Sequence, residues 1–184
     1  MRSARTVAVA AAVIVLSSVA SAPAQAADPP VTVAGPVSEP GGFSRATCPA
    51  GTQIVGGGYD ARHVVNGANN VVDGLVVFAP DPQKANTWTA QMYSGQIRAF
   101  AMCAQGTAPA PRVVLGPASE KGGYSKATCP AGTQLVSGGY ASTPATNGLG
   151  QYIDGVDANT PTNDNSWLAK MTIGIAQAVA LCGS

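Results

Sequence analysis

Four cysteines are the residues of this 184-residue chain with the greatest capacity for chemistry. Cysteines can bind zinc, act as nucleophiles or join as disulfides. A zinc site needs Cys and His ligands clustered at short spacing, and the sequence contains no such cluster. In an exported chain, an even number of cysteines is typical of a disulfide framework. We therefore expect two structural disulfides, formed among Cys48, Cys103, Cys129 and Cys182.

Residues for hydrolytic catalysis are sparse. A nucleophilic triad needs a base, and the single histidine, His63, lies in a stretch with the composition of an exposed loop. Glycoside hydrolysis needs two carboxylates across a cleft, whereas Asp73 and Asp154 each precede a glycine, as turn residues do. The Gly56-Gly57-Gly58 run lacks the Gly-Lys-Ser/Thr end of a phosphate-binding loop. We therefore expect neither an enzyme nor a cofactor.

A long internal repeat organises these residues. Residues 35–59 return at 116–140, 81 positions later, and 19 of the 25 paired positions are identical. A repeat this strong indicates two copies of one small fold rather than one larger fold. It also weakens any proposed site that is built from unrepeated residues, such as one around His63.

The repeat also selects among the three possible cysteine pairings. Matched positions in matched folds should form matched bonds, so we expect the pairs Cys48–Cys103 and Cys129–Cys182. The paired cysteines are 55 and 53 positions apart. A disulfide that closes a loop of that length stabilises a small domain by roughly 4 kcal/mol, because it lowers the entropy of the unfolded chain. Each copy of the repeat would form a lobe of about 75 residues, and a domain that small buries too little surface to fold securely without such a contribution.

The first 26 residues have the features of a secretory signal peptide. Arg2 and Arg5 are followed by a short apolar run and by the small-residue cleavage signature Ala24-Gln25-Ala26. The run is too short to cross a bilayer core of about 30 Å. Removal of the two arginines leaves 8 basic and 9 acidic residues, a net charge of −1. This near-zero charge favours neither nucleic acid nor an anionic membrane, so we expect a secreted protein without membrane insertion.

The remaining chain divides into two lobes. We place lobe 1 with an N-terminal tail at 27–104, a Pro/Ala-rich linker at 105–111, and lobe 2 at 112–184. The 22 glycines and 14 prolines leave no room for a long helix. The sequence predicts an all-β fold of two tandem homologous small antiparallel β-sandwich or barrel lobes, each with one disulfide.

Strand patterns support this fold in both copies. Asp73-Gly74 is a hairpin-turn dipeptide, and Asp154-Gly155 repeats it. We interpret Gly56-Gly57-Gly58 as a bulge or as a place where a neighbouring backbone approaches closely. The strands expected in lobe 1 are Thr52–Val55, Leu75–Phe78, Thr87–Tyr93 and Ile97–Cys103.

Two regions are candidates for binding a partner. If the lobes face each other, repeated side chains would line a common cleft, although core packing is the alternative for the aromatic ones. The N-terminal tail with Val31 and Val33 is suited to strand addition onto a partner, and a stub left by signal cleavage is the alternative. The candidate cleft residues are Arg45, Tyr59, Trp88, Lys126, Tyr140 and Trp167.

The motif resembles a known repeat. Residues 46–59, followed by Trp88 and by Ala101-Met102-Cys103, are similar to a Cys-Pro-x-Gly-x-x-x-x-x-Gly-Gly repeat of secreted proteins from Streptomyces-like actinobacteria. One group with this layout is the small adaptor subunit of umbrella toxin particles, secreted antibacterial complexes. The resemblance implies a two-lobed β protein that bridges a lectin-bearing subunit and a long toxin polypeptide. It also implies a toxin-gripping cleft between the lobes and an N-terminal tail inserted into the lectin subunit.

These observations favour a non-catalytic secreted binding or adaptor protein whose partners are other secreted proteins. Two alternatives remain. A protease inhibitor would use the proline-stiffened segment from Val77 to Lys84 as its reactive loop. A carbohydrate or cell-wall binding protein would use Trp88 and Trp167.

Overall fold

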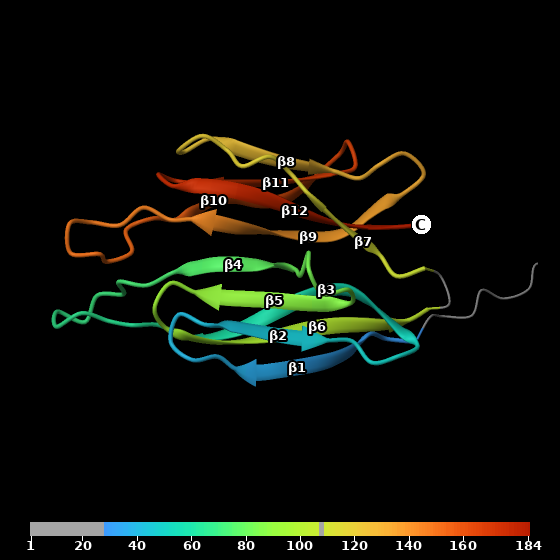
Figure 1. Cartoon of the computed structure of the whole chain (residues 1–184), viewed down its shortest axis with the longest axis horizontal. Coiled ribbons are helices and arrows are strands. Elements are labelled where there is room, and N and C mark those ends of the chain that lie inside the picture. Colours follow the sequence, from blue (N-terminus) through green and yellow to red (C-terminus); the bar gives the residue numbers. More distant parts are fainter. Residues whose placement is uncertain (1–27, 107–108) are drawn as a thin grey trace, which may run out of the picture.

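The computed structural model describes residues 28–106 and 109–184. The predicted signal peptide, 1–26, lies outside these residues. Within them every regular element is a β-strand, which confirms the predicted all-β fold (Figure 1). The strands are β1 (Val31–Val37), β2 (Phe43–Thr47), β3 (Thr52–Arg62), β4 (Leu75–Pro80), β5 (Thr87–Met92), β6 (Gln96–Gln105), β7 (Arg112–Leu115), β8 (Tyr124–Thr128), β9 (Gln134–Thr143), β10 (Val156–Thr162), β11 (Ser166–Met171) and β12 (Ile175–Gly183).

Each repeat forms a lobe with two antiparallel layers. In lobe 1, the layer β1-β6-β3 packs against β2-β5-β4. In lobe 2, the equivalent layers are β7-β12-β9 and β8-β11-β10. The sheets do not close into a barrel, so each lobe is a sandwich. β6 ends at Gln105 and β7 begins at Arg112, on either side of the segment predicted as a linker.

The disulfides have the predicted pairing. Cys48 bonds to Cys103 and Cys129 to Cys182, each with a Cα–Cα separation of 5.6 Å. All four cysteines are buried. Each bond ties the chain just after the second strand of a lobe to the last strand, which lies in the opposite layer. The bond therefore cross-links the two layers of each sandwich.

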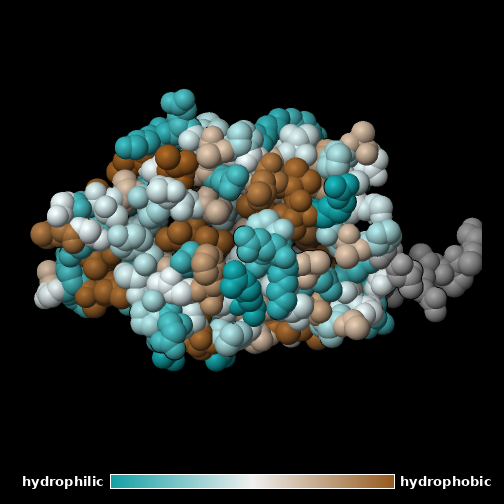
Figure 2. Space-filling model, viewed as in Figure 1, coloured by the Kyte–Doolittle hydropathy of each residue, from teal (hydrophilic) through white to brown (hydrophobic). Residues whose placement is uncertain are grey.

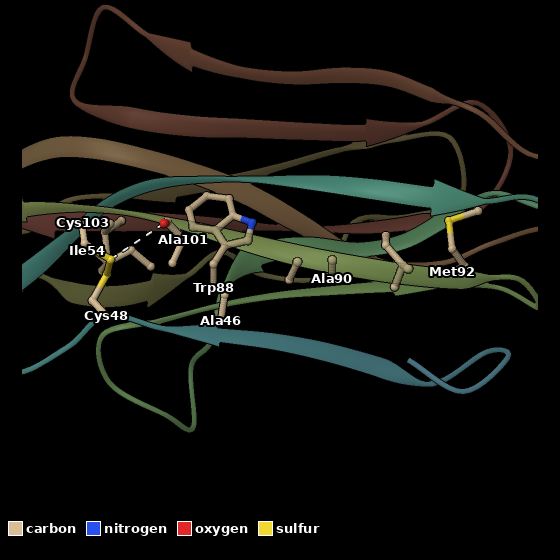
Figure 3. Close-up of a cluster of buried hydrophobic side chains, with 11 residues drawn as sticks. Ala46, Cys48, Ile54, Trp88, Ala90, Met92, Ala101 and Cys103 are labelled. Carbon is tan, nitrogen blue, oxygen red and sulfur yellow. Dashed lines mark hydrogen bonds between the residues drawn. A yellow bond between two sulfur atoms is a disulfide. The ribbon is translucent and has the colours of Figure 1, made fainter. Parts of the chain in front are cut away.

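A tryptophan packed on a glycine fills the centre of each lobe. Trp88 lies in the middle of the buried cluster of lobe 1, between the disulfide and Met92 (Figure 3). A Cβ atom on Gly57 would lie 2.1 Å from the Trp88 ring, and one on Gly138 would lie 2.4 Å from the Trp167 ring. The indoles therefore occupy the space that a side chain would need, which is the close approach predicted for the glycine run.

The lobes join directly through β4 and β9. Phe78 pairs with Tyr140 and Val77 with Ala141, so strands from both repeats form one six-stranded sheet in the order β2-β5-β4-β9-β12-β7. The hydroxyl of Tyr140 donates a hydrogen bond to the backbone oxygen of Leu75 at 3.2 Å. The pairing joins different strands of the two repeats, because the lobe 2 equivalent of β4 is β10. The junction is therefore asymmetric.

The predicted common cleft between repeated residues is wrong. Leu181 of β12 belongs to the buried core of lobe 1, and Leu75 and Phe78 of β4 contact the cores of both lobes. Side chains fill the space between the sandwiches, because burying these apolar groups stabilises the contact between them. The two lobes thus share one continuous apolar interior.

The tryptophan–glycine packing predicts that alanine is not tolerated at two glycines. We expect Gly57→Ala and Gly138→Ala each to lower the free energy of unfolding by about 1–3 kcal/mol, because the added methyl overlaps an indole that has no room to move. Urea denaturation followed by far-UV circular dichroism measures the change. Gly67→Ala and Gly148→Ala are matched controls, since a Cβ there meets no atom within 4 Å. Equal denaturation midpoints for all four variants would contradict the proposed packing.

Candidate functional site

A groove of about 290 Å³ lies on the outer face of the six-stranded sheet, where β4 meets β9. Both lobes contribute to it. Its apolar lining includes Val77 and Ala79 from lobe 1 and Ala141 and Val179 from lobe 2. In Figure 2, apolar surface is visible near β4 and over β7, on the two sides of the junction. The groove exists because the lobes join side by side along an edge of each.

Two exposed apolar side chains border the groove. Phe43 of β2 is 47% exposed and Leu115 of β7 is also 47% exposed. They come from the two end strands of the six-stranded sheet and belong to different lobes. Large apolar side chains exposed beside a concave apolar surface are typical of an interaction site.

A fixed ion pair supplies the polar part of the groove. Arg45 Nε donates to Asp81 Oδ2 at 2.7 Å, and Asp81 is only 3% exposed. The other carboxylate oxygen of Asp81 accepts the backbone N–H groups of Gln83 and Lys84 at 2.9 and 3.1 Å. The guanidinium also lies 4.8 Å from the centre of the Phe43 ring. Arg45 is therefore held in place, and its terminal N–H groups can donate to an oxygen of a ligand.

Lobe 2 does not repeat this site. Tyr124 takes the position of Phe43 and is 65% exposed, with Lys170 Nζ 5.5 Å from its ring centre. Lys126 takes the position of Arg45 and pairs with Asp164, an exposed residue. This hydrogen bond from Lys126 is the main cause that lowers the pKa of Asp164 to about 2. The corresponding face has no adjoining lobe, so it carries polar and charged groups in contact with solvent.

The aromatic residues predicted to line a cleft have other positions. Trp88 is 1% exposed and Tyr140 is 2% exposed, so neither can contact a partner directly. Trp167 is half-buried, packs on the lobe 2 core and donates from Nε1 to Asn159 Oδ1 at 2.7 Å. The prediction of partner contact was wrong for Trp88 and Tyr140, because burying such a large ring in the core stabilises a small sandwich more than leaving it exposed. Tyr59 is 49% exposed and stays a candidate for contact with a partner.

The N-terminal tail with Val31 and Val33 is not free for strand addition. Both residues belong to β1, where Val31 pairs with Cys103 and Val33 with Ala101 of β6. Val33 packs on the core, whereas Val31 is 58% exposed. The strand pairs here because β6 would otherwise present an open edge, and β7 covers the equivalent edge of β12 in lobe 2.

The segment suggested as a protease-binding loop is also mostly structural. Val77 to Pro80 belongs to β4, and Phe78 packs against both cores. A reactive loop must offer an extended, accessible backbone to the protease, which a central strand of a six-stranded sheet cannot do. Trp88 is buried, so it offers a sugar no exposed ring on which to stack.

The repeated aspartates anchor loops instead of forming simple hairpin turns. The two carboxylate oxygens of Asp154 accept backbone N–H groups at 2.8 to 2.9 Å. Burial raises the pKa of Asp154, but these hydrogen bonds outweigh it and hold the pKa below its ordinary value. Asp73 accepts N–H groups in the same way in lobe 1. The four donors to Asp154 are Ala145, Gly155, Ile173 and Gly174.

Of the residues predicted to line a cleft, Arg45 lines this groove, and sequence reasoning missed the other residues that form it. The sequence feature that indicates the groove is a difference between the two copies of the repeat, not a feature that they share. Leu75-Val76-Val77-Phe78 is wholly apolar, whereas the matching Val156-Asp157-Ala158-Asn159 is half polar. Only the apolar strand can be buried at a junction, so this contrast marks β4 as the joining strand.

Comparison of the chain with known protein families, with curated proteins and with solved structures finds no match. Within residues 28–106 and 109–184, no three His, Cys, Asp or Glu residues gather closely enough to hold a metal ion. The same residues contain no helix that is long and apolar enough to cross a membrane. The geometry of the groove therefore carries the functional conclusion.

The hydrogen bonds to Asp154 predict a specific loss of stability in acid. Its folded pKa lies below the ordinary value of 3.8, so its contribution is present above about pH 4 and disappears as the pH falls through the folded pKa. We expect Asp154→Asn to lower the urea midpoint at pH 7 and to make its decrease between pH 5 and pH 2 shallower. Asp157→Asn, which removes an exposed ion pair with Lys170, is the control and should change little at pH 7. An unchanged pH profile for Asp154→Asn would refute this role.

Proposed function

We propose that this chain is a secreted, non-catalytic binding protein that acts as an adaptor between other secreted proteins. The observation that carries the proposal is the groove at the lobe junction, which has an apolar floor, two exposed apolar borders and a fixed arginine. The two disulfides are compatible with an extracellular location, because such bonds persist in oxidising compartments.

The chemistry of the groove favours an extended segment of a protein partner. An apolar side chain of the segment would displace water from Val77 and Ala141, which are only partly buried. Arg45 would donate to a backbone carbonyl or to a carboxylate of the same segment. Because Asp81 neutralises Arg45 only on its Nε side, the guanidinium can make this contact without losing its anchor.

The adaptor role follows from the resemblance to the small subunit of umbrella toxin particles. On that basis the partners would be a lectin-bearing subunit and a toxin polypeptide. Two sandwiches that pair directly through β4 and β9, each cross-linked internally by its own disulfide, are suited to holding two partners close together. Strand β1 uses the residues from Val31 onward within lobe 1, so this proposal assigns partner contact to the groove and not to that strand.

The groove predicts which surface variants lose a partner. We expect the double variant Phe43→Ser, Leu115→Ser to capture at least about tenfold less of a secreted partner than the original chain, because it removes the two most exposed apolar side chains that a bound partner would bury. Arg45→Glu should have a similar effect. The measurement is a pull-down of proteins from the native culture medium with the immobilised chain, quantified by mass spectrometry.

The repeat provides matched controls for this experiment. Tyr124→Ser and Lys126→Glu make the same kinds of change at equivalent, exposed positions outside the groove, and they should leave capture unchanged. Equal capture by the groove variants and the control variants, or no partner at all under gentle conditions, would overturn the proposed function.

A further inference from the structure

The groove at the lobe junction continues along the outer face of lobe 2. A second cavity, of about 140 Å³, shares Ala141 and Gln177 with the groove. It shares Thr143 and Ile175 with a third cavity of about 340 Å³, which lies where β9 ends and β12 begins. Because neighbouring cavities share lining residues, the three are continuous. We name this continuation the β9–β12 track, and it consists of these four residues and of Lys121 at its far end.

Strand pairing places the floor of the track on one face of the sheet. Ala141 lies opposite Gln177, and Thr143 lies opposite Ile175. Opposite residues of an antiparallel pair project to the same face, and so do residues two positions apart on one strand. The four side chains therefore form two successive pairs that lead away from the groove.

The length of the track matches a short extended peptide. Val179 lines the groove, and Ile173 lines the third cavity six positions earlier in the chain. Strand residues advance by about 3.3 Å each, so the two ends are about 20 Å apart. An extended ligand needs about six residues to cover that distance.

The equivalent face of lobe 1 is charged. There Asp60 lies opposite Arg98, and Arg62 lies opposite Gln96. These four residues line a smaller cavity of about 80 Å³. A partner that covered this face would remove charged groups from water, at a cost that only new ionic partners could offset.

The track has no charged side chain at the equivalent positions. In the same order, the repeat replaces the four lobe 1 residues by Ala141, Gln177, Thr143 and Ile175. The Nε2 atom of Gln177 donates to the backbone oxygen of Gly116 at 3.0 Å, so its amide is held in place. A partner can therefore cover the floor of the track without removing a charge from water.

A lysine stands at the far end of the track. Lys121 is exposed and lines the third cavity, and among the described residues it forms no ion pair. Asp154 lies next to this cavity, but its Oδ2 atom accepts the N–H groups of Ala145 and Gly174. The lobe 1 equivalent of Lys121 is Pro40, so the shared fold does not require this charge. The ammonium group is thus available to a carboxylate of a ligand.

We propose that the β9–β12 track holds the continuation of the extended partner segment that fills the groove, and that this segment carries an acidic side chain about six residues beyond its apolar anchor. The inference rests on the proposed function, because groove and track hold one segment. The carboxylate pairs with Lys121, and the residues between are small or aliphatic and cover Ala141 and Ile175.

A peptide selection tests the proposal directly. The probe is a phage-displayed library of random peptides of about twelve residues, which is long enough to span groove and track. The target is the whole mature chain with both disulfides formed. We expect the enriched sequences to carry Asp or Glu about six positions from an aliphatic or aromatic residue, with no charge between them.

Charge reversal at the far end identifies the acidic contact. Selection on Lys121→Glu should enrich Lys or Arg in place of the acidic residue and should retain the apolar residue, because only one end of the site has changed. Arg62→Glu is the matched control, since it reverses an exposed charge on the equivalent face of lobe 1. Its enriched sequences should be those of the original chain.

An exchange between the lobes tests the uncharged floor. The double variant Ala141→Asp, Gln177→Arg copies into the track the Asp60–Arg98 pair that the same sheet position accommodates in lobe 1. We expect it to bind an enriched, fluorescently labelled peptide at least about tenfold more weakly in fluorescence polarisation. The reverse exchange, Asp60→Ala with Arg98→Gln, should bind that peptide normally.

The outcomes separate this inference from the proposed function. Enrichment of sequences without an acidic residue, the same enriched sequences on Lys121→Glu, or no enrichment at all would overturn the inference. Capture of a secreted partner that depends on Phe43 and Leu115 would still support the proposed function in each of these cases. If the Phe43→Ser, Leu115→Ser variant bound the enriched peptides normally, groove and track would not hold one segment, and the inference would again be wrong.

Discussion

The packing of an indole ring against a bare strand backbone is the constraint on which each lobe depends. Small alanines recur among the facing residues of these sandwiches, and Trp88 is the largest fully buried side chain of lobe 1. A ring of that size fits only where the opposite strand has no side chain, at Gly57. The same geometry at Trp167 and Gly138 explains why the two residue types recur together in the chain. The disulfide then holds the layers at the separation that the ring sets.

One pair of substitutions between the repeats explains the asymmetry of the molecule. In lobe 2, Asn159 accepts the hydrogen bond of the Trp167 indole, so β10 keeps a polar edge. In lobe 1 the equivalent residue is Phe78, whose ring centre lies 5.1 Å from that of Trp88. Trp88 Nε1 consequently has no hydrogen-bond acceptor among the described residues. Lobe 1 thus loses one hydrogen bond and gains an apolar strand that can be buried against lobe 2.

That asymmetric junction creates the groove to which we assign binding. Joining β4 to β9 forms the groove on the outer face of the sheet, with Arg45 at its border. The same joining buries Leu181 of lobe 2, whereas its equivalent in lobe 1, Met102, is 42% exposed.

The sequence alone determined the features that both repeats share. The all-β fold, the division into two lobes, the disulfide pairs and the close approach at the glycines follow from local patterns that occur twice. A repeat reports such features reliably, because equivalent residues meet equivalent neighbours within each lobe.

Only the tertiary structure decided how the lobes join. It buried Trp88 and Tyr140, placed Val31 and Val33 in β1, and made Asp154 the anchor of two loops. Each of these outcomes depends on contacts between segments that are distant in the chain, and strand pairing leaves no local pattern that names its partner strand. The groove arises from the same cause, because it forms where non-equivalent strands of two similar lobes pair.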